Sequence, residues 1–231
     1  MQMRSFFIIV FLGAGFAGLA QDIFTTPIDS SYREDQFYIG FTYNVLVDRP
    51  DNVNQTGFSG GLNLGFIRDV PFNNKRTLGI GVGLGLSVNT YVQNLFIGEE
   101  AQNETTIFRA LDRDIITFDT NRFSTYLIEV PFHFRWRSSN IEKYKFWRIY
   151  TGLQLGYIYH FSSYFNQSNN TVRQTDVPEL ERFRLGTSFS FGFNAVNFQV
   201  YYALNDLFDA EIDGEQIGLQ PIKVGLIFYL L

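Results

Sequence analysis

Cysteine is absent from the 231 residues of the sequence. Disulfides and thiolate metal sites are therefore excluded, although export is not, because exported bacterial proteins often lack disulfides. Basic residues are also scarce, since 18 Lys and Arg stand against 23 Asp and Glu, for a formal net charge of −5. The phosphates of nucleic acids require a basic surface, so no nucleic-acid partner is expected.

Long apolar runs are missing after the first twenty residues. Residues 1–20 place Arg4 before the apolar stretch FFIIVFLGAGFAG and end with the small residues Gly18 and Ala20. This pattern is typical of a cleaved signal peptide, and it is shorter than the roughly 20 apolar residues of a membrane anchor. We expect residues 21–35 to form a short periplasmic segment. Any later membrane crossing must use strands.

Aromatic residues, in contrast, make up 18% of the chain, with 26 Phe and 13 Tyr. A water-soluble protein would have to bury most of these rings. A barrel in lipid can point them outward, because its solvent is apolar.

Large apolar residues alternate with small or polar ones in eight segments, residues 36–47, 58–68, 78–86, 124–137, 146–161, 182–193, 196–204 and 221–231. A period of two is typical of strands whose two faces meet different environments. The even number and the segment lengths match membrane-spanning strands. We predict an all-β fold over residues 36–231, an eight-stranded antiparallel transmembrane β-barrel of outer-membrane type.

The predicted connections alternate in length. Those at 69–76, 138–145 and 194–195 are short, and the others are longer, above all residues 89–123. Outer-membrane barrels have short periplasmic turns and long outer loops, so both termini are expected in the periplasm. The long loop is expected either to cover the barrel mouth or to dock a partner. A soluble lipocalin-like barrel is the alternative fold, because periodicity alone does not say which face is outside.

Aromatic residues also recur at the expected membrane interfaces. Phe37, Trp136, Trp147 and Phe193 form a predicted periplasmic girdle. Tyr126, Tyr159, Phe183 and Tyr202 are expected at the other interface. Amphipathic rings favour this level of a bilayer.

The run GIGVGLG places Gly79, Gly81, Gly83 and Gly85 at every second position. A dinucleotide-binding loop requires the spacing G-x-G-x-x-G, which this run lacks. An eight-stranded barrel has an interior only wide enough for side chains. We therefore predict lumen glycines that make room for inward tyrosines, namely Tyr38, Tyr150, Tyr201 and Tyr229.

Five ionisable residues are predicted to face the lumen: Glu129, His133, Arg135, Arg184 and Lys223. Buried charges must pair, so a salt-bridged plug that fixes strand register is favoured over a selective pore or proton path. His133, or His160, also predicted inward, could serve as a general base, but no catalytic constellation accompanies either. The acidic stretch 209–215 resembles a calcium loop whose twelfth position is Gln220, not Glu. No enzyme activity, metal or cofactor is expected.

The chain resembles the PorT-type family of Bacteroidetes outer-membrane barrel proteins over nearly its whole mature region, in stretches such as QFYIGFTYNVL, GFSGGLNLGFIRDVPFNNKR and YKFWRIYTGLQLGYIYHF. The resemblance implies a porin-like barrel in the outer membrane, surrounded by lipid and lipopolysaccharide. For some members it also implies a role in type IX secretion and gliding. A non-enzymatic accessory barrel in an envelope complex is therefore favoured, and a small passive pore is the alternative.

Overall fold

The computed structural model describes residues 35–73, 75–100, 105–112, 114–138, 146–212 and 214–230. The expected signal peptide and residues 21–34 of the expected periplasmic segment lie outside these ranges. Every regular element within them is a strand. No helix in this part of the chain is long and apolar enough to cross a membrane.

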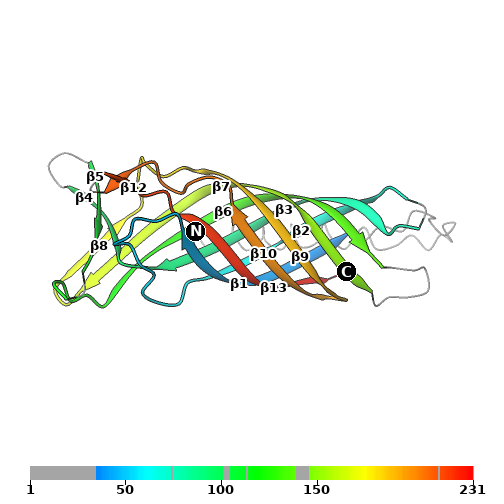
Figure 1. Ribbon diagram of the computed structural model, residues 1–231, viewed down its shortest axis with the longest axis horizontal. Helices are drawn as coiled ribbons and strands as arrows, with labels where there is room; N and C mark the ends of the chain where they lie inside the picture. Colours follow the sequence, from blue (N-terminus) through cyan, green and yellow to red (C-terminus); the bar gives the residue numbers. More distant parts are fainter. Residues whose placement is uncertain are drawn as a thin grey trace, which may run out of the picture. The chain divides into compact units, whose positions relative to one another are not determined.

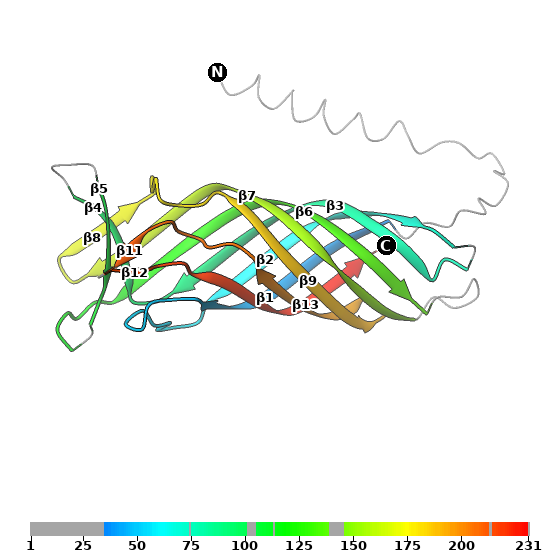
Figure 2. The ribbon, with the colours of Figure 1, turned by 45° about the horizontal axis from the view of Figure 1, so that its top comes forward.

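Eight long strands form the barrel, and each is antiparallel to its neighbours (Figures 1 and 2). They are β1 (Gln36–Val47), β2 (Gly60–Pro71), β3 (Leu78–Val92), β6 (Thr120–Arg137), β7 (Trp147–Gln167), β9 (Phe183–Phe193), β10 (Val196–Ala203) and β13 (Gln220–Leu230). The barrel closes where β13 pairs with β1, from Phe37 opposite Leu230 to Val47 opposite Gln220. Closure removes the unpaired edges that lipid could not satisfy. The predicted fold class is confirmed.

Five short strands lie at one end of the barrel. β4 (Leu95–Glu100) pairs with β5 (Thr105–Ala110), β8 (Asn170–Gln174) extends the sheet beside β7, and β11 (Glu211–Ile212) pairs with β12 (Glu215–Gln216). We call this the loop end, at the left of Figure 1, because it carries the long connections between barrel strands. The opposite, turn end carries the short connections, such as 72–77 and 194–195.

The long loop predicted at residues 89–123 is largely strand. β3 continues to Val92, β6 begins at Thr120, and the β4–β5 hairpin lies between them. Alternation does continue through this region, but apolar residues such as Tyr91 and Phe123 now lie inside the barrel. In this region the apolar residues face inward and the polar residues outward. An alternation read for outward apolar residues therefore does not identify these strands.

The barrel wall has an apolar outer face and a polar inner face in its middle section. On β2 and β3, Leu64 and Leu84 are exposed while Asn63 and Ser87 are buried. Exposed large apolar side chains occur on all eight barrel strands. Soluble monomers rarely expose so continuous an apolar surface to water. The lipocalin-like alternative, which needs an apolar interior, is therefore wrong.

One β-bulge interrupts the pairing of β6 with β7. Tyr126 lies opposite His160, whereas the next residue, Leu127, lies opposite Ile158, so Tyr159 is an extra residue on β7. Beyond a bulge the two faces of a strand exchange. Phe161 is therefore buried and His160 is exposed, and the predicted inward position of His160 is wrong.

The four glycines of β3 lie against large neighbours. A Cβ at Gly81 would meet the side chain of Arg135, and one at Gly85 would collide with the hydroxyl of Tyr38. At Gly83 and Gly79 the nearest atoms are backbone carbonyl oxygens of β2. A glycine outside this run, Gly186, likewise faces the ring of Tyr201. The small residues thus leave space for specific inward side chains and for close strand approach.

The same substitution should have effects of different size at two glycines on β7. A Cβ at Gly152 would collide with the backbone carbonyl of Phe132, which cannot rotate away. At Gly156 the nearest atom would be Leu127 Cδ2 at 3.3 Å, which a small side-chain adjustment accommodates. We expect Gly152→Ala to lower the free energy of unfolding by about 2 kcal/mol, and Gly156→Ala by less than about 1 kcal/mol. Urea unfolding in lipid vesicles measures both, and equal losses would contradict the packing described.

Candidate functional site

The lumen is the candidate site, and its loop end is filled by an apolar plug. Phe208, from the connection between β10 and β13, is at its centre. Its ring centroid lies 5.4 Å from that of Phe108, 5.8 Å from Phe123 and 5.9 Å from Phe161. The remaining buried members include Leu95 and Ile97 of β4, and Leu46, Val53, Tyr91, Leu127, Ile158, Val177, Leu180, Leu207, Ile212, Ile217 and Leu219.

The plug shows what part of the expected long loop does. Leu95 and Ile97 are almost fully buried, and Phe108 packs against the same cluster. The β4–β5 hairpin therefore closes the barrel mouth, one of the two expected roles. Ile107 and Ile115 remain exposed on the outside of the same connection.

The turn end is closed by an ion cluster centred on Asp69, which is fully buried. Asp69 Oδ1 lies 2.9 Å from Arg135 Nη1, and Asp69 Oδ2 lies 2.8 Å from Arg137 Nη2. Arg135 also donates to Gln36 Oε1, and its guanidinium carbon lies 4.2 Å from the ring centroid of Tyr150. Breaking such a buried pair is costly because it leaves an uncompensated charge. The cluster therefore fixes β1, β2 and β6 relative to one another.

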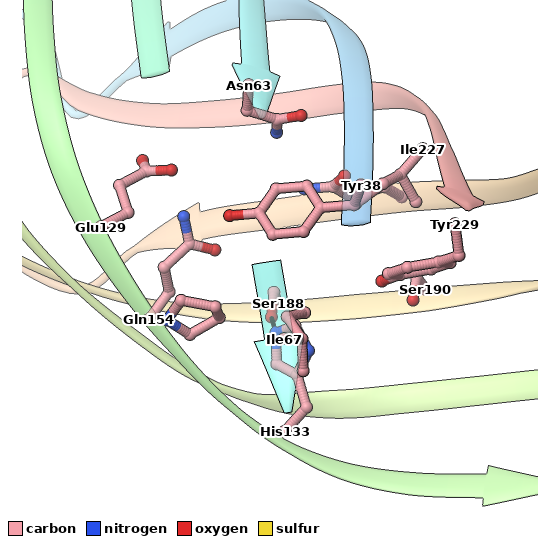
Figure 3. A pocket seen from close by; sticks show the side chains of 12 residues that line it. Tyr38, Asn63, Ile67, Glu129, His133, Gln154, Ser188, Ser190, Ile227 and Tyr229 are labelled. Atoms are coloured by element: carbon pink, nitrogen blue, oxygen red, sulfur yellow. Dashed lines mark hydrogen bonds between the residues drawn. The ribbon is translucent and has the colours of Figure 1, made fainter. Parts of the chain in front are cut away.

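The middle of the lumen holds a second ion pair and a small cavity. Lys223 Nζ lies 3.4 Å from Glu129 Oε1 and 4.5 Å from the ring centroid of Tyr201. The cavity measures about 20 Å³ and is lined in part by Tyr38, Glu129 and His133 (Figure 3). A volume of this size holds about one water molecule.

Arg184 and His133 have other partners. The Arg184 guanidinium donates to the backbone carbonyls of Asn205, at 2.7 Å, and Asp206. It thereby anchors the connection that carries Phe208. His133 Nε2 lies 3.1 Å from Ser188 Oγ. The structure thus places all five predicted charged residues inside the barrel, but distributes them over three levels.

Three buried charged residues were not predicted. Asp69 lies in an expected connection, and Arg137 and Arg148 are not among the residues expected to face the lumen. Arg148 donates to the backbone carbonyl of Asn194, and its guanidinium lies 4.4 Å from the ring centroid of Phe146. All three continue the inward alternation of their strands. Arg137 and Arg148 already lie within the expected strands 124–137 and 146–161, so following the alternation to those positions identifies them as inward. Asp69 needs the expected strand 58–68 to be extended by one residue.

The chemistry available inside the lumen is limited. A histidine beside a serine hydroxyl is the arrangement of a general base and a nucleophile. Here His133 Nδ1 is buried without a hydrogen-bond partner, so no third group orients the imidazole as in a catalytic triad. Among the described residues, no three His, Asp or Glu side chains are grouped closely enough to hold a metal ion.

The predicted periplasmic girdle lies on the outer wall at the turn end. Its four members, Phe37, Trp136, Trp147 and Phe193, are all exposed. The rings of Trp147 and Phe193 are 5.6 Å apart on neighbouring strands. Exposed aromatic rings at a barrel rim are positioned for the membrane interface.

The ion cluster predicts a large effect for one carboxylate. We expect Asp69→Asn to lower the free energy of unfolding by about 3 kcal/mol, because Arg135 and Arg137 would lose their shared buried carboxylate. Asp51, exposed in the connection after β1, is the control, and Asp51→Asn should change stability by less than about 0.5 kcal/mol. Urea titrations of the refolded barrels in vesicles compare them. Similar midpoints for Asp69→Asn and the unmodified chain would contradict the role of the cluster.

Of the comparisons with known proteins, the family model supports this architecture. Among solved structures, two engineered mutants of the porin from Rhodopseudomonas blastica are each 11% identical, with a TM-score of 0.22, and the match covers 86% of this chain and 100% of the porin. That similarity is too low to carry an argument. No curated protein matches the chain significantly. The family model for the outer membrane protein beta-barrel domain matches residues 19–209, most of the chain. The protein therefore belongs to the outer membrane protein beta-barrel domain family.

Proposed function

We propose that this outer-membrane protein is a non-enzymatic barrel with a closed lumen, and that it serves as a structural or accessory component of an envelope complex. The observation that carries the proposal is the filled interior. The apolar plug, the Glu129–Lys223 pair and the Asp69 ion cluster follow one another from the loop end to the turn end.

The order of these layers opposes conduction. An ion entering at the loop end meets the aromatic rings around Phe208, and an apolar constriction excludes both water and ions. At the turn end, an ion would have to separate Asp69 from two arginines, which is unfavourable inside a low-dielectric lumen. Passage through the centre would need both barriers to open.

The complex that we propose is a type IX secretion or gliding apparatus, on the strength of the resemblance to PorT-type barrels. With the lumen filled, the surfaces left for partners are the outer wall and the loop end. We place the loop end outside the cell and both termini in the periplasm, because long connections face outward in barrels of this kind. The exposed Ile107 and Ile115 lie in the loop-end connection between β3 and β6 and offer apolar contacts.

The absence of enzymatic activity is part of the proposal. His133 and Ser188 are both buried inside the barrel, beside a cavity that holds about one water molecule. A substrate could not reach them. His160, the other histidine, is outside the barrel, and the centroid of its ring lies 5.2 Å from that of Tyr126.

Planar-bilayer recordings test the closed lumen. We expect the purified full-length barrel to produce no stable unitary current, whereas an open porin inserted into the same bilayer supplies the positive control. Stable currents that disappear in Glu129→Gln or Arg184→Gln variants would show a conducting lumen. That result would replace the accessory role with the small passive pore.

Affinity purification of the tagged chain from native membranes tests the partner. We expect at least one envelope protein to be recovered in a fixed ratio to the barrel, and deletion of the gene to reduce the set of secreted proteins. A tagged unrelated outer-membrane barrel is the control for chance recovery. No fixed-ratio partner, together with an unchanged set of secreted proteins, would remove the secretion role.

A further inference from the structure

A row of three side chains on the outer face of the loop end is not explained by the filled lumen. Arg122 of β6 lies opposite Tyr164 of β7, which lies opposite Arg173 of β8. The guanidinium carbons of Arg122 and Arg173 are 5.6 Å and 5.4 Å from the centroid of the Tyr164 ring. We call these residues the Arg–Tyr–Arg row. The bulge at Tyr159 produces it, because it turns Tyr164 to the same outer face as Arg122.

The two arginines of the row are exposed. Among the described residues, neither forms an ion pair. Two carboxylates of the same region are engaged elsewhere. Asp119 accepts a hydrogen bond from Asn166 at 3.4 Å, and Glu99 accepts one from Gln174 at 3.1 Å. A cation–π contact orients a guanidinium but leaves its five N–H donors available.

The height of the row on the barrel indicates what these donors meet. Below Arg122 on the same face of β6 come Ser124, then Tyr126, then the exposed Ile128 and Val130. The ring centroids of Tyr126 and Tyr159 are 6.3 Å apart, and both residues belong to the aromatic set expected at the loop-end membrane interface. Four residues of strand rise about 13 Å, or about 10 Å along the membrane normal at the usual tilt. Headgroups occupy the first 5–8 Å or so beyond the apolar core, and long arginine side chains can reach down to them.

We propose that Arg122 and Arg173, with Tyr164 between them, bind the phosphate group of a lipid headgroup beside the barrel wall. The planar guanidinium matches the geometry of phosphate oxygens and binds them with charge-assisted hydrogen bonds. The proposal requires a chain embedded in the outer membrane, and it does not depend on the secretion role. With the loop end outward, the ligand is a phosphorylated glycolipid of the outer leaflet.

A protein ligand fits this surface less well. The outward positions around the row are polar, namely Thr120, Ser124, Ser162, Asn166 and Thr171. The buried core of a protein interface is usually depleted in charge and rich in apolar or aromatic anchors. The single aromatic residue here, Tyr164, already contacts the two guanidinium groups.

Native mass spectrometry of the full chain in neutral detergent tests the proposal with lipid A that carries two phosphates. We expect the double variant Arg122→Gln/Arg173→Gln to bind it about thirtyfold more weakly than the unmodified chain, since each arginine contributes roughly a kilocalorie per mole near a charged lipid surface. The control is Arg49→Gln/Arg109→Gln, which removes two exposed loop-end arginines outside the row. This control should bind within about twofold of the unmodified chain.

Two further arms identify the source of the phosphate. Lipid A without phosphates should bind the unmodified chain as weakly as the phosphorylated lipid binds the double variant. Inorganic phosphate at millimolar concentration should not displace the phosphorylated lipid. Equal lipid binding by the unmodified chain and the double variant would overturn the proposal, and so would displacement by inorganic phosphate alone. Circular dichroism of each variant confirms that the barrel is folded before binding is measured.

Discussion

The requirement that every backbone N–H and C=O group be paired within lipid determines this structure. It is met when β13 pairs with β1 over eleven residues, from Phe37 opposite Leu230 to Val47 opposite Gln220. Eight strands closed in this way enclose a space only wide enough for side chains. The lumen must therefore be packed as densely as a protein core, although the apolar face of the barrel wall points outward and the polar face inward. The glycines of β3 and the inward tyrosines meet this packing requirement together.

The lumen offsets the cost of its buried charges by pairing residues that are far apart in the sequence. Glu129 and Lys223 are 94 residues apart, and Asp69 joins two arginines of β6. Such pairs add little net stability compared with well-packed apolar residues, but they penalise any slip of register that would separate them. Glycine-rich strands specify their register weakly, so in this barrel the penalty helps to keep neighbouring strands aligned.

The sequence predicted the membrane-spanning part of the fold well, because strict alternation holds wherever one face meets lipid. It failed where that condition ends. Toward the loop end the inner face becomes apolar, as at Phe123, and the alternation there predicts a loop where β3 and β6 continue. Asp69 lies one residue past the expected end of its strand, in the expected connection 69–76. The pairing of inward residues could not be predicted, since it depends on which positions of distant strands share a level. The bulge at Tyr159, which moved His160 outside, has no recognisable sequence signal.

The extra residue at Tyr159 decides which side chains in the loop-end part of β7 face inward and which face outward. If β7 alternated without interruption, Phe161 and Phe165 would point away from the barrel axis, and Ser162 and Tyr164 would point toward it. The plug would lose the ring of Phe161, and Phe165 would lose its contacts with Phe96 and Phe118. The outer surface would lose the centre of its arginine row. One inserted residue therefore assigns the upper half of β7 to two surfaces of opposite polarity. It lets a single strand serve a lipid-facing wall below and a water-facing sheet above.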